Sequence, residues 1–130
     1  MPAESHWPHS RCRRIIFQLA QTTARVPLFV RARFFDGLAD PARLAILEAL
    51  RHGERTAGEL AASAVLSPSS ASKHLACLRD CGLVESRQDW RHVYYCLAAG
   101  VGDLLDANDL FIERVADRVA ACQRPEMRRR

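Results

Sequence analysis

The sequence contains almost no lysine. Eighteen of its 19 basic residues are arginine, and Lys73 is the only lysine. It also lacks an apolar run close to the roughly 20 residues that a membrane span needs, so we expect no membrane partner. A chain of 130 residues holds one domain with one core and leaves no room for a catalytic domain besides.

A secretory framework is also missing. Residues 11–20 resemble a signal peptide only loosely, because glutamine and threonine interrupt the apolar stretch that follows and no cleavage site stands out. The five cysteines are an odd number, at positions 12, 77, 81, 96 and 122. In a chain that we predict to be cytoplasmic, such cysteines favour metal or redox chemistry over structural disulfides.

The net charge of +4 is unevenly distributed. Residues 1–35 hold six arginines against one glutamate, residues 36–97 hold seven basic and eight acidic residues, and residues 98–130 hold six of each. We therefore expect a basic N-terminal arm over 1–25, partly helical over 13–25, a folded domain over 26–122 and a basic tail over 123–130. A modest charge with local basic spots suits a DNA-binding protein without proving one.

Helix-start patterns mark the middle of the chain. Asp40-Pro41 and Ser67-Pro68 each place a capping side chain before a proline, and Thr56 to Glu59 has the form of a capping box. They predict helices beginning at 41, 57 and 68, the last running to 81 and stopped by Gly82. A further helix is expected to begin near Pro27, with apolar residues up to Leu38 on one face.

A hairpin and a long helix are predicted to follow. Residues 83–84 and 92–97 have the composition of strands, and the polar stretch 86–91 joins them. Residues 102–122 carry an apolar stripe longer than a small hairpin can cover, which favours packing against a partner subunit. The predicted fold is mainly α with a small β-hairpin wing, a winged helix-turn-helix.

The helix from 68 has the composition of a DNA-reading element. Its first turns are small and polar, so they can approach a major groove closely, while Leu75 and Leu78 suit the buried face. Two arginines flank the tip of the hairpin, where phosphate contact or minor-groove insertion is typical. We predict contacts with double-stranded operator DNA from Ser69, Ser70, Ser72, Lys73, His74, Arg87 and Arg91. The alternative is an ordinary helical hairpin with solvated serines.

Several segments together resemble one family. LADPARLAILEALRHGE, GELA, SPSSASKHLACLRDCGLV and RHVYYCLA, within about residues 28–120, are similar to the ArsR/SmtB family of metal-responsive winged-helix repressors. The resemblance implies a homodimer that pairs through its first and last helices, binds an inverted-repeat operator and is released by an inducer. The family usually has glycine at the wing turn, where this chain has Trp90. Because positive φ is costly for tryptophan, we expect a different wing tip.

Cys77 and Cys81 are the candidate sensing residues. Four residues apart on a helix, they lie about 40° apart around its axis, so two thiolates on one face can hold a soft cation. HLACLRDCGL resembles the motif of the cadmium/lead-sensing CmtR-type branch, in which a third cysteine comes from the C-terminal region of the other subunit. Here Cys122 has the matching position. The resemblance thus implies Cd²⁺ or Pb²⁺ as inducer, with Zn²⁺ or arsenite as alternatives.

Other sites of the family are absent from this sequence. The segment GELAAS has no thiol, and the last helix has carboxylates but no histidine, a poor donor set for a soft metal.

Three alternatives remain for the thiols. Cys77 and Cys81 could be small buried residues, and we expect this of Cys96 in its strand. A redox sensor of the same fold would form a disulfide between Cys77 and Cys81 or with Cys122, and it ranks lower because helical cysteines four apart are usually too distant for a relaxed disulfide without backbone movement. A small thiol oxidoreductase would need Cys-x-x-Cys at a helix start, so we expect no enzyme. The role of Cys12 stays open.

Overall fold

A computed structural model describes residues 26–124 of the chain. The predicted arm over 1–25, its helix over 13–25, Cys12 and the tail beyond 124 lie outside the described residues. The chain divides between Phe35 and Asp36 into two compact units, which are described separately. The second unit carries all the DNA-binding and thiol candidates.

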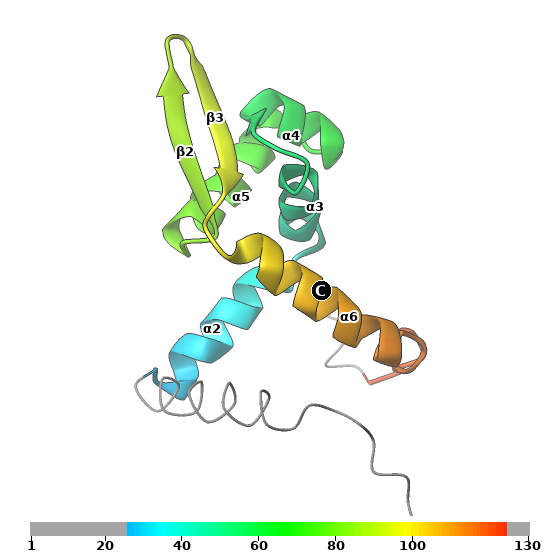
Figure 1. Cartoon of the computed structure of the whole chain (residues 1–130). Coiled ribbons are helices and arrows are strands. Elements are labelled where there is room, and N and C mark those ends of the chain that lie inside the picture. The colour runs from blue at the N-terminus through cyan, green and yellow to red at the C-terminus, as the bar shows by residue number, and fades with distance from the viewer. Residues whose placement is uncertain (1–25, 125–130) are drawn as a thin grey trace, which may run out of the picture. The chain divides into compact units, whose positions relative to one another are not determined.

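The element order is that of a helix-turn-helix followed by a hairpin and a long helix (Figure 1). The elements are α2 (Leu28–Leu38), α3 (Pro41–Leu50), β1 (Arg55–Thr56), α4 (Ala57–Ser63), α5 (Pro68–Asp80), β2 (Val84–Asp89), β3 (His92–Leu97) and α6 (Val101–Ala120).

Side-chain caps start three of these helices at the predicted places. The Asp40 carboxylate accepts hydrogen bonds from the backbone N–H groups of Ala42 and Arg43, at 2.8 and 3.1 Å. Thr56 and Glu59 form a reciprocal capping box at α4, and the Ser67 hydroxyl accepts from the N–H of Ser70 at α5. These caps satisfy N–H groups that have no partner inside the helix. The predicted helix starts are confirmed.

The core lies where α3, α4 and α5 pack together. Six side chains are almost completely buried there and at the base of the hairpin: Ile46, Leu47, Leu60, Leu75, Leu78 and Val84. The sequence assigned Leu75 and Leu78 to this buried face of α5, and both are 1% exposed. Burial of one face of α5 leaves its opposite face toward solvent.

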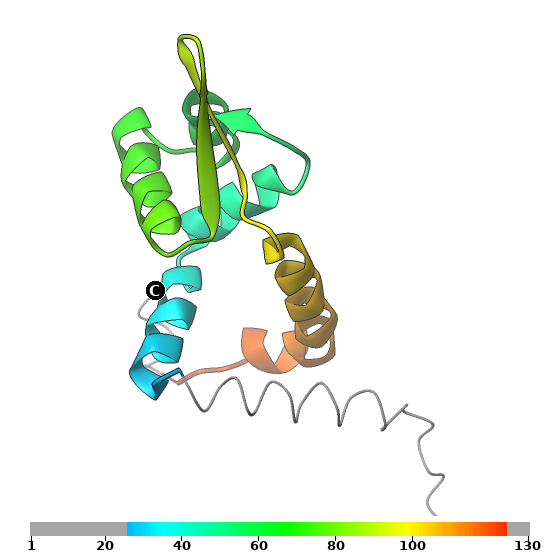
Figure 2. The ribbon, with the colours of Figure 1, turned by 60° about the vertical axis from the view of Figure 1, so that its left-hand side comes forward.

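The sheet has three antiparallel strands in the order β1-β3-β2. The two-residue β1, which the sequence analysis did not predict, pairs Arg55 with Tyr95 and Thr56 with Tyr94. A backbone hydrogen bond of 2.9 Å from Leu83 N–H to the Leu78 carbonyl ties the base of the hairpin to α5. Figure 2 shows α5 beside that base. The wing is therefore anchored on both its edges.

The wing tip differs from the expectation. Strand β2 runs to Asp89, which pairs with His92, so the predicted loop over 86–91 shrinks to Trp90 and Arg91. Trp90 adopts a φ of 53°, which is the positive φ that we expected tryptophan to avoid. The prediction that the chain would avoid this conformation with a different wing tip was therefore wrong. The register forces this tight turn, whose first residue favours glycine or asparagine. Left-handed backbone costs a residue with a Cβ roughly 1–2 kcal/mol.

Two helical segments expose large apolar side chains. In the first unit, α2 exposes Leu28, Phe29, Val30 and Phe35. In the second unit, α6 buries Val101 and Leu105 near its start but exposes Leu110, Phe111, Ile112 and Val119 further on. None of the described helices is both long and apolar enough to cross a membrane.

Candidate functional site

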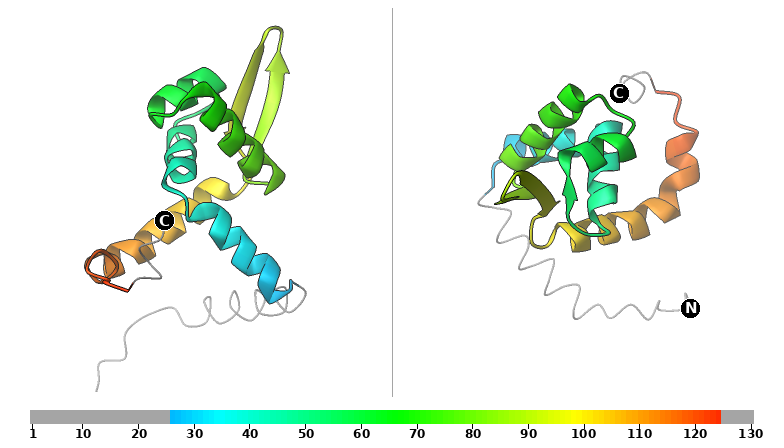
Figure 3. Two further views of the ribbon diagram at one scale, coloured as in Figure 1. Left: turned by 180° about the vertical axis from the view of Figure 1, so that it is seen from behind. Right: turned by 90° about the horizontal axis from the view of Figure 1, so that it is seen from above.

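The exposed face of α5 carries most of the predicted DNA contacts. Ser69, Ser72 and Lys73 are exposed, while Ser70 and His74 are half-buried. The Ser69 hydroxyl shares a hydrogen bond with that of the capping Ser67, at 3.3 Å. A row of small polar side chains with one ammonium therefore faces solvent on the first two turns. Figure 3 shows the ribbon of α5 close to the hairpin within the second unit.

The two wing arginines have different surroundings. The Arg87 guanidinium donates to both carboxylate oxygens of Glu54, with N–O distances of 2.6 to 3.1 Å, and lies 4.8 Å from the centroid of the Tyr94 ring. Arg91 lies at the tip, where its guanidinium is 4.5 Å from the centroid of the Trp90 ring. Arg87 thus braces the wing, whereas Arg91 projects with the tip. Whether either contacts DNA stays a prediction.

Glu54 is a residue that the sequence analysis missed. It lies in the turn before β1 and is 33 positions from Arg87, so no local pattern connects the two. The side-chain hydrogen bond from Arg87 holds the pKa of Glu54 below its ordinary value, and the same bond raises the pKa of Arg87. The pair joins the middle of β2 to the turn that follows α3.

Cys77 and Cys81 lie together at the C-terminal end of α5, as their spacing predicts. Cys77 is half-buried and Cys81 is exposed. Partial burial of the thiol and the neighbouring Cys77 raise the pKa of Cys81, while the charge of Arg43 lowers it. Metal binding to such a pair has to displace protons.

Arg43 connects the thiols to the end of α2. Its Nη1 is 3.8 Å from the Cys77 Sγ, its Nε donates to the Gly37 carbonyl, and its Nη2 donates to the Asp36 carbonyl at 3.3 Å. A Cβ built on Gly37 would come within 3.8 Å of the Cys81 Sγ. The thiol pair is therefore in contact range of both the last turn of α2 and the first turn of α3.

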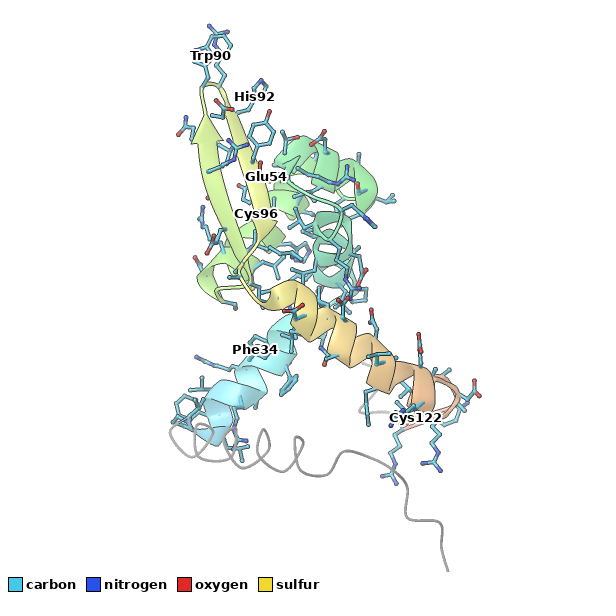
Figure 4. The ribbon with its side chains drawn as sticks, in the orientation of Figure 1. Phe34, Glu54, Trp90, His92, Cys96 and Cys122 are labelled. Carbon is cyan, nitrogen blue, oxygen red and sulfur yellow. The ribbon has the colours of Figure 1, made fainter. Side chains whose placement is uncertain are left out.

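The other cysteines lie elsewhere. Cys122 follows the last turn of α6 and is half-buried, and Cys96 is half-buried in β3. Figure 4 places Cys122 at the far end of α6 from Cys96 and the hairpin. Across residues 26–124 of a single chain, no group of three histidine, cysteine or acidic residues is arranged to hold a metal. One chain brings together Cys77 and Cys81 but does not add Cys122.

Arg51 joins α3 to α6. It follows the last residue of α3, and its guanidinium forms ion pairs with Asp106 at 3.1 Å and Asp109 at 2.8 Å, and with Glu48 at 3.3 Å. Desolvation of Arg51 opposes its charge, but the bond to Asp109 and the charge of all three carboxylates outweigh this and raise its pKa. Helix α3 thus carries one arginine toward the thiols and another toward α6.

Comparisons with known proteins place this arrangement in a known group. Residues 40–86 match the model of "Bacterial regulatory protein, arsR family". The chain is 41% identical over 104 residues to the "Probable mercury resistance operon repressor" of Streptomyces lividans, covering 76% of this chain and 80% of that protein. It is equally similar over 104 residues to the transcriptional regulator CmtR of Mycobacterium tuberculosis, covering 74% and 88%.

Solved structures show the same fold. A homodimeric winged helix-turn-helix DNA-binding domain from Mycobacterium bovis has a TM-score of 0.64 and 30% identity, over 70% of this chain and 85% of that one. The cadmium sensor CmtR of M. tuberculosis has a TM-score of 0.51 and 44% identity, over 58% and 80%. The predicted fold class is confirmed. The relatives are named as transcriptional regulators, which confirms that the chain is not an enzyme.

The Glu54–Arg87 pair gives a pH-dependent prediction. Because the pKa of Glu54 is lowered from 4.5, the pair stabilises the fold above about pH 4.5 and loses this effect as the pH falls through the lowered value. Glu54→Gln should therefore lower the Tm most near neutral pH, and the difference from wild type should shrink in acid. Thermal unfolding followed by circular dichroism measures this.

Glu85→Gln is the matched control, since Glu85 is an exposed carboxylate on β2 itself. Its Tm difference from wild type should not follow the same course with pH. Identical pH profiles for the two variants would show that the ion pair does not brace the wing.

Proposed function

Because the chain belongs to the arsR family of bacterial regulatory proteins, we propose that it is a cytoplasmic repressor released from its operator when thiolates bind a soft metal ion. The observation that carries the proposal is the proximity of Cys77, in the last turn of α5, to Cys81, which caps that helix; the other end of α5 bears the side chains predicted to contact DNA. The inducer and the reading surface thus share one helix.

The DNA surface is the exposed face of α5 together with the wing. Hydroxyls of Ser69, Ser70 and Ser72 suit phosphates and base edges, and the half-buried His74 borders them. Lys73 supplies a compact charge, and Arg91 a planar one at the wing tip. The Arg87 guanidinium is bonded to Glu54. In this proposal it contacts DNA only through N–H groups that the Glu54 carboxylate does not occupy. The target is an inverted repeat, read by two copies of α5.

A homodimer fits the exposed apolar side chains. The distal half of α6 leaves Leu110, Phe111 and Ile112 more than half exposed, which is unusual for large apolar residues with no partner. A similar set is exposed on α2. The solved M. bovis relative is described as homodimeric. A second copy covering these faces would also place two reading helices on one operator.

Soft metal chemistry fits the donor set. Two thiols on adjacent turns suit Cd²⁺, Pb²⁺ or Hg²⁺ better than a hard cation, and Zn²⁺ and arsenite also accept such ligands. Two similar proteins are named for responses to thiol-seeking metals, one for mercury resistance and one for cadmium. These names support a soft inducer, and Cd²⁺ or Pb²⁺ remains the first choice from the cysteine motif.

The third thiolate comes from a second subunit in this proposal. Within one chain Cys122 lies at the end of the 20-residue α6, and no three-residue ligand group forms among the described residues. A dimer built on α6 brings the Cys122 of one subunit near the other subunit. The partner's Cys122 then completes the site, which makes metal binding depend on the dimer.

Helix α3 provides a physical route from the metal site to the dimer helix. Arg43 at its start bonds to the end of α2 and contacts Cys77, while Arg51 just after its end holds α6 through Asp106 and Asp109. A metal ion bound to the Cys77 sulfur competes with the contact that Arg43 Nη1 makes to the same atom. A coupling of about 1–3 kcal/mol through such a network loosens operator binding about 5–150-fold.

Lys73→Ala should weaken operator binding and reduce the slope of log K against log[salt] by about one unit, because one phosphate contact is lost. Fluorescence anisotropy over a salt series measures both, with an operator selected from a random library by the wild-type protein. Arg79→Ala is the control, an exposed cation in the last turn of the same helix. If wild type is monomeric in sedimentation and retains no duplex at low salt, the proposed function fails.

Cys77→Ser and Cys81→Ser should each bind the operator almost as wild type does but remain bound when Cd²⁺ or Pb²⁺ is added. Serine keeps the size of the side chain but is a poor ligand for a soft ion. Cys122→Ser should weaken the metal response more than basal DNA binding, whereas Cys96→Ser should change stability only. Anisotropy with and without metal, under reducing conditions, gives the result.

Charge-transfer absorption in the same titrations reports sulfur–metal bonds directly. If Cys77→Ser and Cys81→Ser still release DNA at the metal concentrations that act on wild type, the thiol pair is not the sensing site. Release that requires an oxidant, and no metal, would establish the redox alternative instead.

Arg43→Lys should separate metal binding from DNA release. Lysine keeps the positive charge near the thiols. Its single nitrogen cannot reproduce the planar guanidinium, whose three nitrogens bond to two backbone carbonyls and contact the Cys77 sulfur. We expect charge-transfer absorption to appear as in wild type while the metal-induced loss of operator affinity shrinks several-fold. Equal release by wild type and Arg43→Lys would mean that coupling does not pass through this side chain.

A further inference from the structure

We propose that Trp90 is a DNA-contacting wedge, which enters the minor groove at the wing tip together with Arg91. This rests on the proposed DNA binding and is independent of the metal response. Trp90 lies at the outermost turn of the hairpin, where its side chain projects from the fold (Figure 4). It is 77% exposed, the second-highest exposure among the large apolar residues of the described chain after Val65.

The backbone at Trp90 argues against a purely structural role. The residue has a φ of 53° in a two-residue turn, where glycine or asparagine would sit without strain. Nor does the indole contribute to the core, because most of it faces solvent. Strain together with an exposed aromatic group is the pattern expected of a side chain kept for binding.

Arg91 identifies the partner. Its guanidinium stacks on the indole at 4.5 Å, so the tip presents a flat apolar surface backed by a positive charge. Arginine is attracted to the strong negative potential of a narrow minor groove, and apolar side chains inserted there partly unstack base steps. Because the wing is tied to α5, whose exposed face is the proposed DNA-reading surface, a DNA duplex is the surface that this tip meets.

The wing holds this tip at a set position relative to α5. Its base is tied to α5 by the bond from Leu83 to Leu78, and its middle is fixed by Arg87 to Glu54. The strands between add a paired register of six residues on each side. When α5 occupies a major groove, a wing braced in this way carries its tip to the neighbouring minor groove. Trp90 then helps to distinguish between DNA sequences by the width of their minor groove and the flexibility of their base steps. This selectivity adds to that of the major-groove contacts of α5.

Three variants at the tip test the proposal, on the selected operator duplex. Trp90→Asn keeps the turn, since asparagine tolerates positive φ, but removes the ring. It should lower operator affinity on the order of tenfold, at the low end of what aromatic–base contacts contribute, and leave the salt slope unchanged. Trp90→Phe should retain most of the affinity. Arg91→Ala should instead reduce the salt slope by about one unit.

Fluorescence gives an independent measurement, because the chain has only two tryptophans, Trp7 and Trp90. In a Trp7→Phe protein, operator binding should shift the Trp90 emission and protect it from acrylamide. If that protein binds DNA but Trp90 stays as accessible as in the free protein, and Trp90→Asn binds as tightly as wild type, the wedge is refuted. Failure of wild type to bind any duplex would instead refute the proposed function.

Discussion

The burial of one face of α5 is the constraint on which the other features depend. Leu75 and Leu78 are almost fully buried against α3 and α4, so the rotation of α5 about its axis is set. That rotation turns Ser69, Ser72 and Lys73 to solvent and leaves the thiols of Cys77 and Cys81 at the edge of the core. The Leu78 carbonyl also accepts the bond that anchors the hairpin. The packing of α5 against α3 and α4 therefore positions the exposed face of α5, the wing and the thiol pair together.

Arginine connects these parts. Arg43, Arg51 and Arg87 each tie two elements through a planar set of donors, to carbonyls and a thiol, to carboxylates of α6, and to Glu54. A lysine donates from a single nitrogen and lacks the planar set of donors on three nitrogens that reaches several acceptors at fixed angles. The near absence of lysine, first noticed as a feature of composition, has a structural meaning at these positions. Most such pairs are exposed, so we expect them to orient elements more than to stabilise the fold.

Local patterns were predicted well. The caps at Asp40, Thr56 and Ser67, the buried stripe of α5 and the proximity of Cys77 to Cys81 all depend on residues three or four positions apart, and the structure agrees with each. The wing tip was predicted wrongly because the cost of positive φ at Trp90 was weighed alone. Pairing of Asp89 with His92 leaves only two residues to turn the chain, and this long register outweighs the local strain.

The sequence by itself determined the helix starts, the polar and apolar faces and the thiol spacing, because these follow from the helical repeat and from short-range hydrogen bonds. Only the tertiary structure decided the pairing of β1 with β3 and the partners of three arginines. Arg43 and Cys77 are 34 positions apart, Arg87 and Glu54 33, and Arg51 and Asp109 58. Such contacts form only after α3, α5 and the hairpin have packed. No local sequence pattern predicts them. The separation of Cys122 from the thiol pair within one chain likewise follows from the direction and length of α6.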